Sequence, residues 1–233
     1  MTGIERVKAT FKRKQLDRIA YYPIVSGLAA KVIGVSTGDY YRDLRKLAKA
    51  HIALYDRLQQ DVVVLMGDLF MEVEALGAKV DFPDDDLPRL RDYLLEEKQK
   101  LATLSVPDPL KSGRMPDYIE ACNYVSNEIK DSPVGGVICG PWTVATNLRG
   151  AQNLLMDTVT DPQFVHELMK FAVEVVKPFG EGVARAGAGL SLSEAPASIS
   201  LISPKIYREF VLPYQKEVIS HLREKRISVT LHI

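Results

Sequence analysis

Short, almost entirely apolar runs alternate with longer amphipathic stretches along this chain. A run of this kind, rich in Val, Ile and Leu and bounded by Gly or polar residues, is typical of a strand buried on both faces of a parallel sheet. The pattern predicts five such strands, at residues 20–25, 61–67, 135–140, 187–193 and 227–233.

The amphipathic stretches have the spacing of helices with one buried face. They predict helices over residues 39–60, 87–99 and 115–130, with a surface hairpin around residues 78–86. Two further helices are predicted to begin at Asp161-Pro162 and Ser203-Pro204, because a capping side chain followed by proline is a common helix start. Pro213 is expected to interrupt the second of these helices.

Alternation of strands and helices predicts an α/β fold with a parallel sheet. The sheet could be open and doubly wound, or it could form the first five strands of a (β/α)8 TIM barrel. The segment after the first strand, Ser26-Gly27-Leu28-Ala29, contains neither a dinucleotide fingerprint nor a P-loop, which favours the barrel. With no internal repeat or linker, residues 1–233 are expected to form a single domain.

Composition narrows the range of partners and compartments. Lys+Arg and Asp+Glu both number 30, so the net charge gives no support for a nucleic-acid or membrane-surface partner. No apolar run approaches the length of about 20 residues that a membrane-spanning helix needs. Cys122 and Cys139 are the two cysteines, and with no secretory signal they indicate a cytoplasmic protein without a disulfide framework.

Polar and aromatic residues follow the predicted strands at their carboxyl ends. In a TIM barrel these ends share one rim, where the chemistry takes place. The candidate site residues are Asp68, Trp142, Asn147, Arg149, Ser193, Glu194 and His232.

Five of these candidates also have a purely structural interpretation. Asp68 could cap the following turn, and Trp142 could be a packing residue. Asn147 and Arg149 could be solvated loop residues, and Glu194 could be a salt-bridge partner.

Other titratable residues are expected to lie outside the site. His51 falls on an apolar helix stripe and is interpreted as a core histidine, and His166 and His221 are expected to be exposed. The acidic triplet at 84–86 lacks the ligand spacing of an EF-hand and is interpreted as a solvated loop.

His232 closes the last predicted strand. Side chains at positions i and i+2 of a strand face the same way, so a ligand at position 234 could share a metal ion with His232. A folded domain is not expected to end on such a strand. We therefore expect the protein to continue beyond Ile233 as part of a larger catalytic unit.

Several motifs together resemble the uroporphyrinogen decarboxylase superfamily. They are Met66-Gly67-Asp68-Leu69 with Glu74-Ala75-Leu76-Gly77, Gly140-Pro141-Trp142-Thr143 with Asn147-Leu148-Arg149-Gly150, and Leu201-Ile202-Ser203-Pro204 with Phe210-Val211-Leu212-Pro213-Tyr214. The resemblance implies a (β/α)8 barrel, of which this chain would cover about two-thirds.

The superfamily has a decarboxylase branch and a branch of zinc methyltransferases that work with a corrinoid. The decarboxylases bind a tetrapyrrole with eight carboxylates through an arginine-bearing loop after the first strand. Residues 25–30 of this chain contain no arginine, and Asn147 stands where that branch has a tyrosine. Asp68 matches that branch's essential aspartate, but its Gly-Asp context also suits the methyltransferases.

The methyltransferase branch carries a His-x-Cys motif at the end of strand five, and Leu231-His232-Ile233 resembles its first half. The resemblance implies that His232 binds zinc, that Glu194 is a ligand or lies next to the ligands, and that Asp68 and Asn147 line the pocket. The other zinc ligands would lie beyond Ile233. Zinc with an open position holds a thiol as its thiolate, the form that can attack a methyl group on cobalt.

These observations predict a zinc-activated methyltransferase that moves a methyl group between a methylated substrate or thiol and a corrinoid. The corrinoid would be carried by a partner protein. Asp68 and Glu194 are predicted catalytic residues, and Trp142, Asn147, Arg149 and Ser193 are predicted to bind substrate or cofactor. The alternatives are a uroporphyrinogen decarboxylase-type lyase and a non-catalytic barrel that binds a corrinoid or a partner protein.

Overall fold

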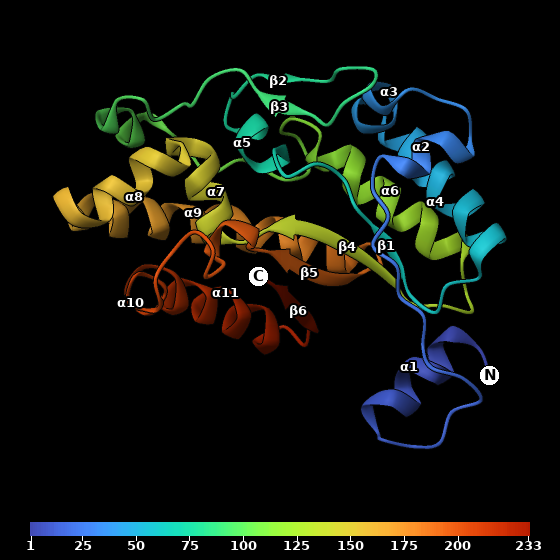
Figure 1. Ribbon diagram of the computed structural model, residues 1–233. Helices are drawn as coiled ribbons and strands as arrows, with labels where there is room; N and C mark the ends of the chain where they lie inside the picture. Colours follow the sequence, from blue (N-terminus) through green and yellow to red (C-terminus); the bar gives the residue numbers. More distant parts are fainter.

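A curved parallel sheet forms the centre of the molecule in the computed structural model, which describes residues 1–233 (Figure 1). Its four strands are hydrogen-bonded in the order β1-β4-β5-β6, and all neighbours are parallel. A separate two-stranded antiparallel hairpin pairs β2 with β3. The strands are β1 (Val63–Leu65), β2 (Val80–Asp81), β3 (Arg89–Leu90), β4 (Val134–Cys139), β5 (Gly189–Ser193) and β6 (Val229–His232).

Helices connect the strands and cover one face of the sheet. The α-helices are α1 (Gly3–Phe11), α2 (Leu28–Val32), α3 (Thr37–Arg42), α4 (Leu44–Leu58), α5 (Met71–Ala75), α6 (Met115–Glu128), α7 (Pro141–Arg149), α8 (Ala151–Thr160), α9 (Pro162–Arg185), α10 (Pro204–Ile206) and α11 (Leu212–Glu224). Short 3-10 turns cover Lys98–Thr103 and Ala195–Ala197, and a π-helical turn covers Tyr207–Val211. None of these helices combines the length and hydrophobicity needed to cross a membrane.

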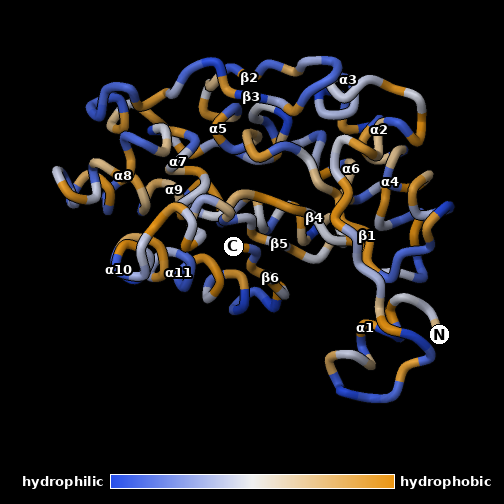
Figure 2. Tube along the Cα trace, in the orientation of Figure 1, coloured by the Kyte–Doolittle hydropathy of each residue, from blue (hydrophilic) through white to orange (hydrophobic).

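Alternate strand residues divide between the two faces of the sheet. Leu65, Ile138 and Leu192 are buried in the core that the sheet forms with α4, α6, α9 and α11. Figure 2 shows hydrophobic colours along β1 and β4 and mixed colours along the surrounding helices. The opposite face carries Val137 and Ser191, and it borders the pocket that holds the candidate site. A sheet covered by helices on one face and hollow on the other has the layout of part of a barrel.

The predicted parallel α/β fold is confirmed, but the first predicted strand is not formed. Residues 20–25 form no ladder with β1, and their backbone bond to this part of the chain runs from Asp61 N, two residues before β1, to Tyr21 O at 2.8 Å. Pro23 has no N–H to donate within this segment. The sheet therefore has four strands where five were predicted, and the closed barrel is not observed.

Two helix predictions also require correction. The single helix expected over residues 39–60 is divided into α3 and α4 at Asp43, whose side chain accepts a hydrogen bond from Arg45 N at 3.0 Å. An aspartate that caps a new helix in this way ends the preceding one. The helix expected over residues 87–99 is absent, because residues 89–90 pair with β2 instead.

The remaining helix predictions agree with the structure. Asp161 caps α9 through a 3.2 Å bond from Phe164 N, with Pro162 at the first position. Ser203 caps α10 in the same manner, and the π-helical turn that follows leads into α11 just before Pro213. The surface hairpin is confirmed as β2 and β3.

Candidate active site

A pocket of about 220 Å³ lies on the open face of the sheet and reaches the carboxyl ends of β5 and β6. Ser193 and His232 are register partners on these two strands, so their side chains project from the same face. The pocket is lined by Tyr22, Ile24, Val64, Met66, Val137, Ser191, Ser193, Thr230, Leu231 and His232. The sheet thus brings two of the predicted site residues into one cavity.

This pocket has a wall without formal charge. Its ten lining residues include no lysine, arginine, aspartate or glutamate. The polar groups are the hydroxyls of Ser191, Ser193, Thr230 and Tyr22 and the imidazole of His232, which is exposed to solvent. Such a wall suits a neutral, partly apolar group better than a polyanion, because a buried anion needs a cation or several donors beside it.

Glu194 is fully buried and lies under the amino end of α7. Its carboxylate accepts hydrogen bonds from the Trp142 N at 3.2 Å, and from the Thr143 N at 2.8 Å and hydroxyl at 2.9 Å. Gln215 of α11 donates a fourth bond at 3.4 Å. A helix amino terminus attracts an anion, so this carboxylate substitutes for a capping side chain.

Burial and donors act in opposite directions on the pKa of Glu194. Loss of hydration raises the pKa, whereas the bonds from Thr143, Trp142 and Gln215 lower it; the balance leaves the pKa at about 7. The carboxylate faces α7 and α11 and is not part of the pocket wall that carries His232. The two residues are joined by their backbones, through a 2.8 Å bond from Glu194 N to His232 O.

Gly140 makes the close approach between Glu194 and α7 possible. A Cβ atom at this position would lie 2.3 Å from the Cδ of Glu194 and 2.5 Å from its Cγ. No pair of non-bonded carbon atoms tolerates that separation. The Gly140-Pro141-Trp142-Thr143 motif therefore forms the binding site for the carboxylate of Glu194.

Trp142 is a packing residue next to the Glu194 carboxylate. Its side chain is buried, and the indole Nε1 donates to the carbonyl of Pro196 at 3.3 Å. The indole therefore ties α7 to the turn after β5 and does not line the pocket.

Asp68 and Asn147 meet at the turn between β1 and α5. Asp68 accepts hydrogen bonds from the Phe70 N at 2.8 Å and from the Arg114 Nη1 at 2.6 Å. Asn147 donates from Nδ2 to the carbonyl of Leu69 at 2.6 Å. Both residues thus act on the three-residue turn formed by Asp68, Leu69 and Phe70.

Arg149 lies in a different cluster. Its Nε donates to the Asp157 Oδ2 at 2.8 Å, and its Nη1 donates to the carbonyls of Leu95 at 2.6 Å and Glu96 at 2.7 Å. The guanidinium is buried in these contacts and joins α7 and α8 to the segment before the 3-10 turn at Lys98.

Three further residues organise the site, and a sequence motif points to only one of them. Arg114 pairs with Asp68, but 46 positions separate the two in the chain. Glu72 accepts a 2.7 Å bond from the backbone N–H of Cys139, although its other carboxylate oxygen is buried without a partner. Thr143 belongs to the recognised motif, so its contact with Glu194 could have been suspected.

The residues present do not form a zinc site by themselves. No group of three or more His, Cys, Asp or Glu side chains is arranged to hold a metal ion. His232 is free to supply one imidazole from the pocket wall. Cys139 is buried, its thiol donates to the Leu69 carbonyl at 3.1 Å, and burial raises its pKa well above the ordinary value, which opposes formation of a thiolate.

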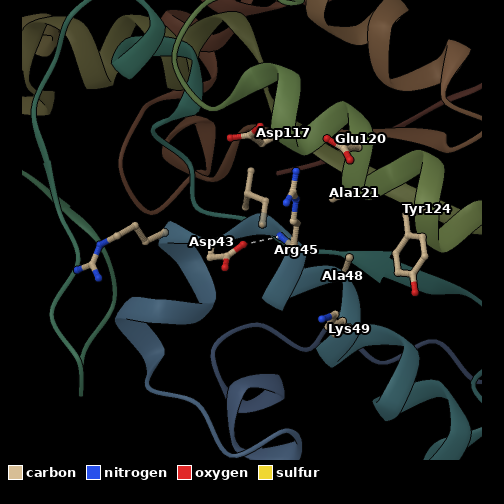
Figure 3. A pocket seen from close by; sticks show the side chains of 10 residues that line it. Asp43, Arg45, Ala48, Lys49, Asp117, Glu120, Ala121 and Tyr124 are labelled. Carbon is tan, nitrogen blue, oxygen red and sulfur yellow. Dashed lines mark hydrogen bonds between the residues drawn. The ribbon is translucent and has the colours of Figure 1, made fainter.

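A larger hollow of about 510 Å³ lies between α4 and α6, away from the predicted site residues (Figure 3). Figure 3 shows Arg45 and Lys49 on the α4 wall and Asp117 and Glu120 on the α6 wall. Small side chains at Ala48 and Ala121 leave the space between the two helices.

The chain matches known proteins along almost its full length. The family model described as uroporphyrinogen decarboxylase (URO-D) matches residues 2–233. A solved structure described as a methyltransferase from Methanosarcina mazei covers the whole chain with a TM-score of 0.87 at 23% identity, and the chain covers 70% of that structure. The two structures therefore share the same fold.

Curated relatives include proteins from both branches. A methylated-thiol–coenzyme M methyltransferase of Methanosarcina mazei is 28% identical over 225 residues, which are 93% of this chain and 60% of the relative. The methylcobamide:CoM methyltransferase MtbA of Methanosarcina acetivorans is 22% identical, over 100% of this chain and 70% of its own length. A uroporphyrinogen decarboxylase of Thermodesulfovibrio yellowstonii is 26% identical over 70% of this chain and 48% of its own length. The chain therefore spans 60–70% of the two methyltransferases.

Proposed function

The chain belongs to the uroporphyrinogen decarboxylase family, and within it we propose that the protein is a methyltransferase that works with a corrinoid. The methyl group would pass between a methylated substrate or thiol, such as coenzyme M, and a corrinoid carried by a partner protein. Similarity to two methyltransferases over 93% and 100% of the chain supports this choice of branch.

The uncharged pocket wall is the observation that carries the proposal. A methyl group bound to sulfur or cobalt is small and apolar, and the side chains of Val64, Met66 and Val137 offer it an apolar surface. A tetrapyrrole with eight carboxylates would need cations at the same wall, and the wall has none. The wall therefore favours transfer of a methyl group over decarboxylation of a polyanion.

His232 is proposed as one zinc ligand, in a ligand set that residues 1–233 do not complete. Zinc, when bound, would hold a thiol as its thiolate and so supply the nucleophile. The backbone of His232 is fixed by the bond from Glu194 N and by pairing with β5, so its imidazole enters the pocket from a defined position. Ser193, its register partner, offers a hydroxyl beside it.

Glu194 is proposed to organise the rim from outside the pocket. Its carboxylate holds the first turn of α7, and its N–H holds the end of β6. A single residue thus fixes the positions of α7 and of the strand that carries His232. Its predicted contribution to catalysis would come through this arrangement.

Asp68 does not line the pocket, because its side chain is 2% exposed and paired with Arg114. Its burial therefore does not distinguish a methyltransferase from the decarboxylase alternative. The alternative of a barrel that only binds a corrinoid or a protein would show binding of methylcobalamin without turnover.

The proposal is tested by an assay of methyl transfer from methylcobalamin to coenzyme M, in which the loss of the methyl–cobalt absorbance measures the rate. Zinc analysis of the purified protein is the second measurement. We expect transfer by the wild type and at least about a 10- to 100-fold loss of kcat/KM and of bound zinc in His232→Ala. His221→Gln is the matched control, since His221 lies on α11 and bonds to Glu181 at 2.8 Å. Full activity of His232→Ala would contradict the assignment.

A further inference from the structure

Arg114 joins four parts of the chain from the position just before α6. Its Nη1 donates to Asp68 Oδ2 at 2.6 Å and to the Tyr41 carbonyl at 2.9 Å, and its Nε donates to Glu74 Oε2 at 2.7 Å. Its guanidinium carbon lies 4.5 Å from the ring centre of Phe82. The end of α3, the β1–α5 turn, α5 and the β2–β3 hairpin all converge on this one side chain.

The pair between Arg114 and Asp68 is buried. The side chains are 10% and 2% exposed, so water does not replace a lost partner. Burial also raises the pKa of Glu74, against the lowering effect of Arg114. Removal of one member of a buried pair leaves the other charge uncompensated, which is far more costly than loss of a surface pair.

The β1–α5 turn connects the Arg114–Asp68 pair to α7 and to the end of β4. Asp68 Oδ1 accepts from the Phe70 N, which closes the turn. The Leu69 carbonyl, in the middle of the turn, accepts from Asn147 Nδ2 at 2.6 Å and from Cys139 Sγ at 3.1 Å. The position of Asp68 therefore sets the position of the acceptor that holds the α7 side chain and the end of β4.

We propose that Arg114 is a positioning residue that fixes the turn Asp68–Phe70 and, through the Leu69 carbonyl, orients Asn147 and the carboxyl end of β4. The fork of the guanidinium is required, because one group must bond to Asp68 and Glu74 in different directions. A lysine keeps the charge but presents a single ammonium. The effect on catalysis rests on the proposed function, whereas the effect on the turn does not.

Hydrogen exchange at the Phe70 amide tests the structural step directly. In Arg114→Gln the amide loses its fixed acceptor, and we expect its exchange to accelerate by at least about tenfold relative to that of core amides. Arg114→Lys should lie between the wild type and Arg114→Gln. Exchange at Phe70 that is unchanged in Arg114→Gln, or no slower in Arg114→Lys than in Arg114→Gln, would overturn the proposal.

Arg6→Gln is the matched control, because Arg6 also pairs with a buried aspartate, Asp61, at 2.8 Å, near the amino ends of the strands. This variant should lose stability without a selective change at Phe70. Fluorescence of Trp142, the single tryptophan, reports the global stability of each variant. If Arg114→Gln does not fold, exchange of the Phe70 amide is compared between Arg114→Lys and Arg6→Lys instead.

Kinetics test the link to the reaction. We expect Arg114→Lys to lower kcat for methyl transfer by up to about 100-fold with a much smaller change in KM, as expected for displaced groups. An equal kcat in Arg114→Lys and the wild type would overturn the positioning role. If the wild type transfers no methyl group, the proposed function fails, and the exchange measurement still decides whether Arg114 fixes the turn.

Discussion

Glu194 combines complete burial with a carboxylate at a helix amino terminus, so its ionisation is coupled to folding. Its pKa rises from 4.5 to about 7 in the folded protein, mainly because burial removes hydration. The folded protein keeps this proton up to about pH 7, whereas the unfolded chain releases it near pH 4.5. The contribution of Glu194 to stability is therefore present below about pH 4.5 and is lost as the pH rises to about 7.

Glu194→Gln should remove this pH dependence. The free energy of unfolding of the variant, relative to the wild type, is expected to increase by about 3 kcal/mol between pH 4.5 and pH 8, since 1.36 kcal/mol corresponds to one pKa unit. Urea titrations followed by Trp142 fluorescence measure this difference. Glu224→Gln, at the exposed end of α11, is the control. A difference that is constant with pH would contradict the assigned pKa.

The positions of some site residues could be predicted from the sequence, and those of others could not. His232 and Ser193 could be placed in one pocket, because strand periodicity and parallel register determine where strand-end residues point. The direction of Glu194 could not be predicted in the same way. It follows the end of β5, where periodicity no longer applies, and turns toward α7. Arg114 was missed because its partners come from three separate segments.

At the scale of elements, the junction of β4 and α7 depends on close contact between two segments. Gly140 lies between the last residue of β4 and the first residue of α7, against the carboxylate of Glu194. Thr143 and Gln215 hold that carboxylate, so it cannot move aside without losing its bonds.

Gly140→Ala should therefore be destabilising. The added Cβ would overlap Glu194, and we expect a loss of about 1–3 kcal/mol in the free energy of unfolding, as for other overpacked sites. Gly135→Ala in β4 is the control, because the nearest atom to its added Cβ belongs to Val64, at 3.9 Å. Thermal and urea unfolding of the two variants give the comparison. Equal stability of both would show that Glu194 can move freely.

The elements that could be predicted carry local signals. Asp161-Pro162 at the start of α9 is a cap and a fixed first turn, and both act within a few residues. The failures depend on contacts that are distant in sequence. Residues 20–25 have strand composition but do not form a ladder, and residues 89–90 are drawn into a hairpin by β2.

At the scale of the whole molecule, the two faces of the sheet have different roles. One face packs against α4, α6, α9 and α11 and forms the core. The other face leaves the uncharged pocket that ends at Ser193 and His232. The sequence could predict this division in outline, because the parallel α/β alternation and the residues at the strand ends are both visible in it. The absence of charge from the pocket wall could not be predicted, because it depends on the register of the four strands.

The pocket on the open face of the sheet is proposed to serve methyl transfer and not decarboxylation. The most direct measurement compares two reactions of the same purified protein: methyl transfer from methylcobalamin to coenzyme M, and release of CO2 from uroporphyrinogen III. We predict methyl transfer that depends on His232, with no CO2 release above the background. Release of CO2 without methyl transfer would contradict the account.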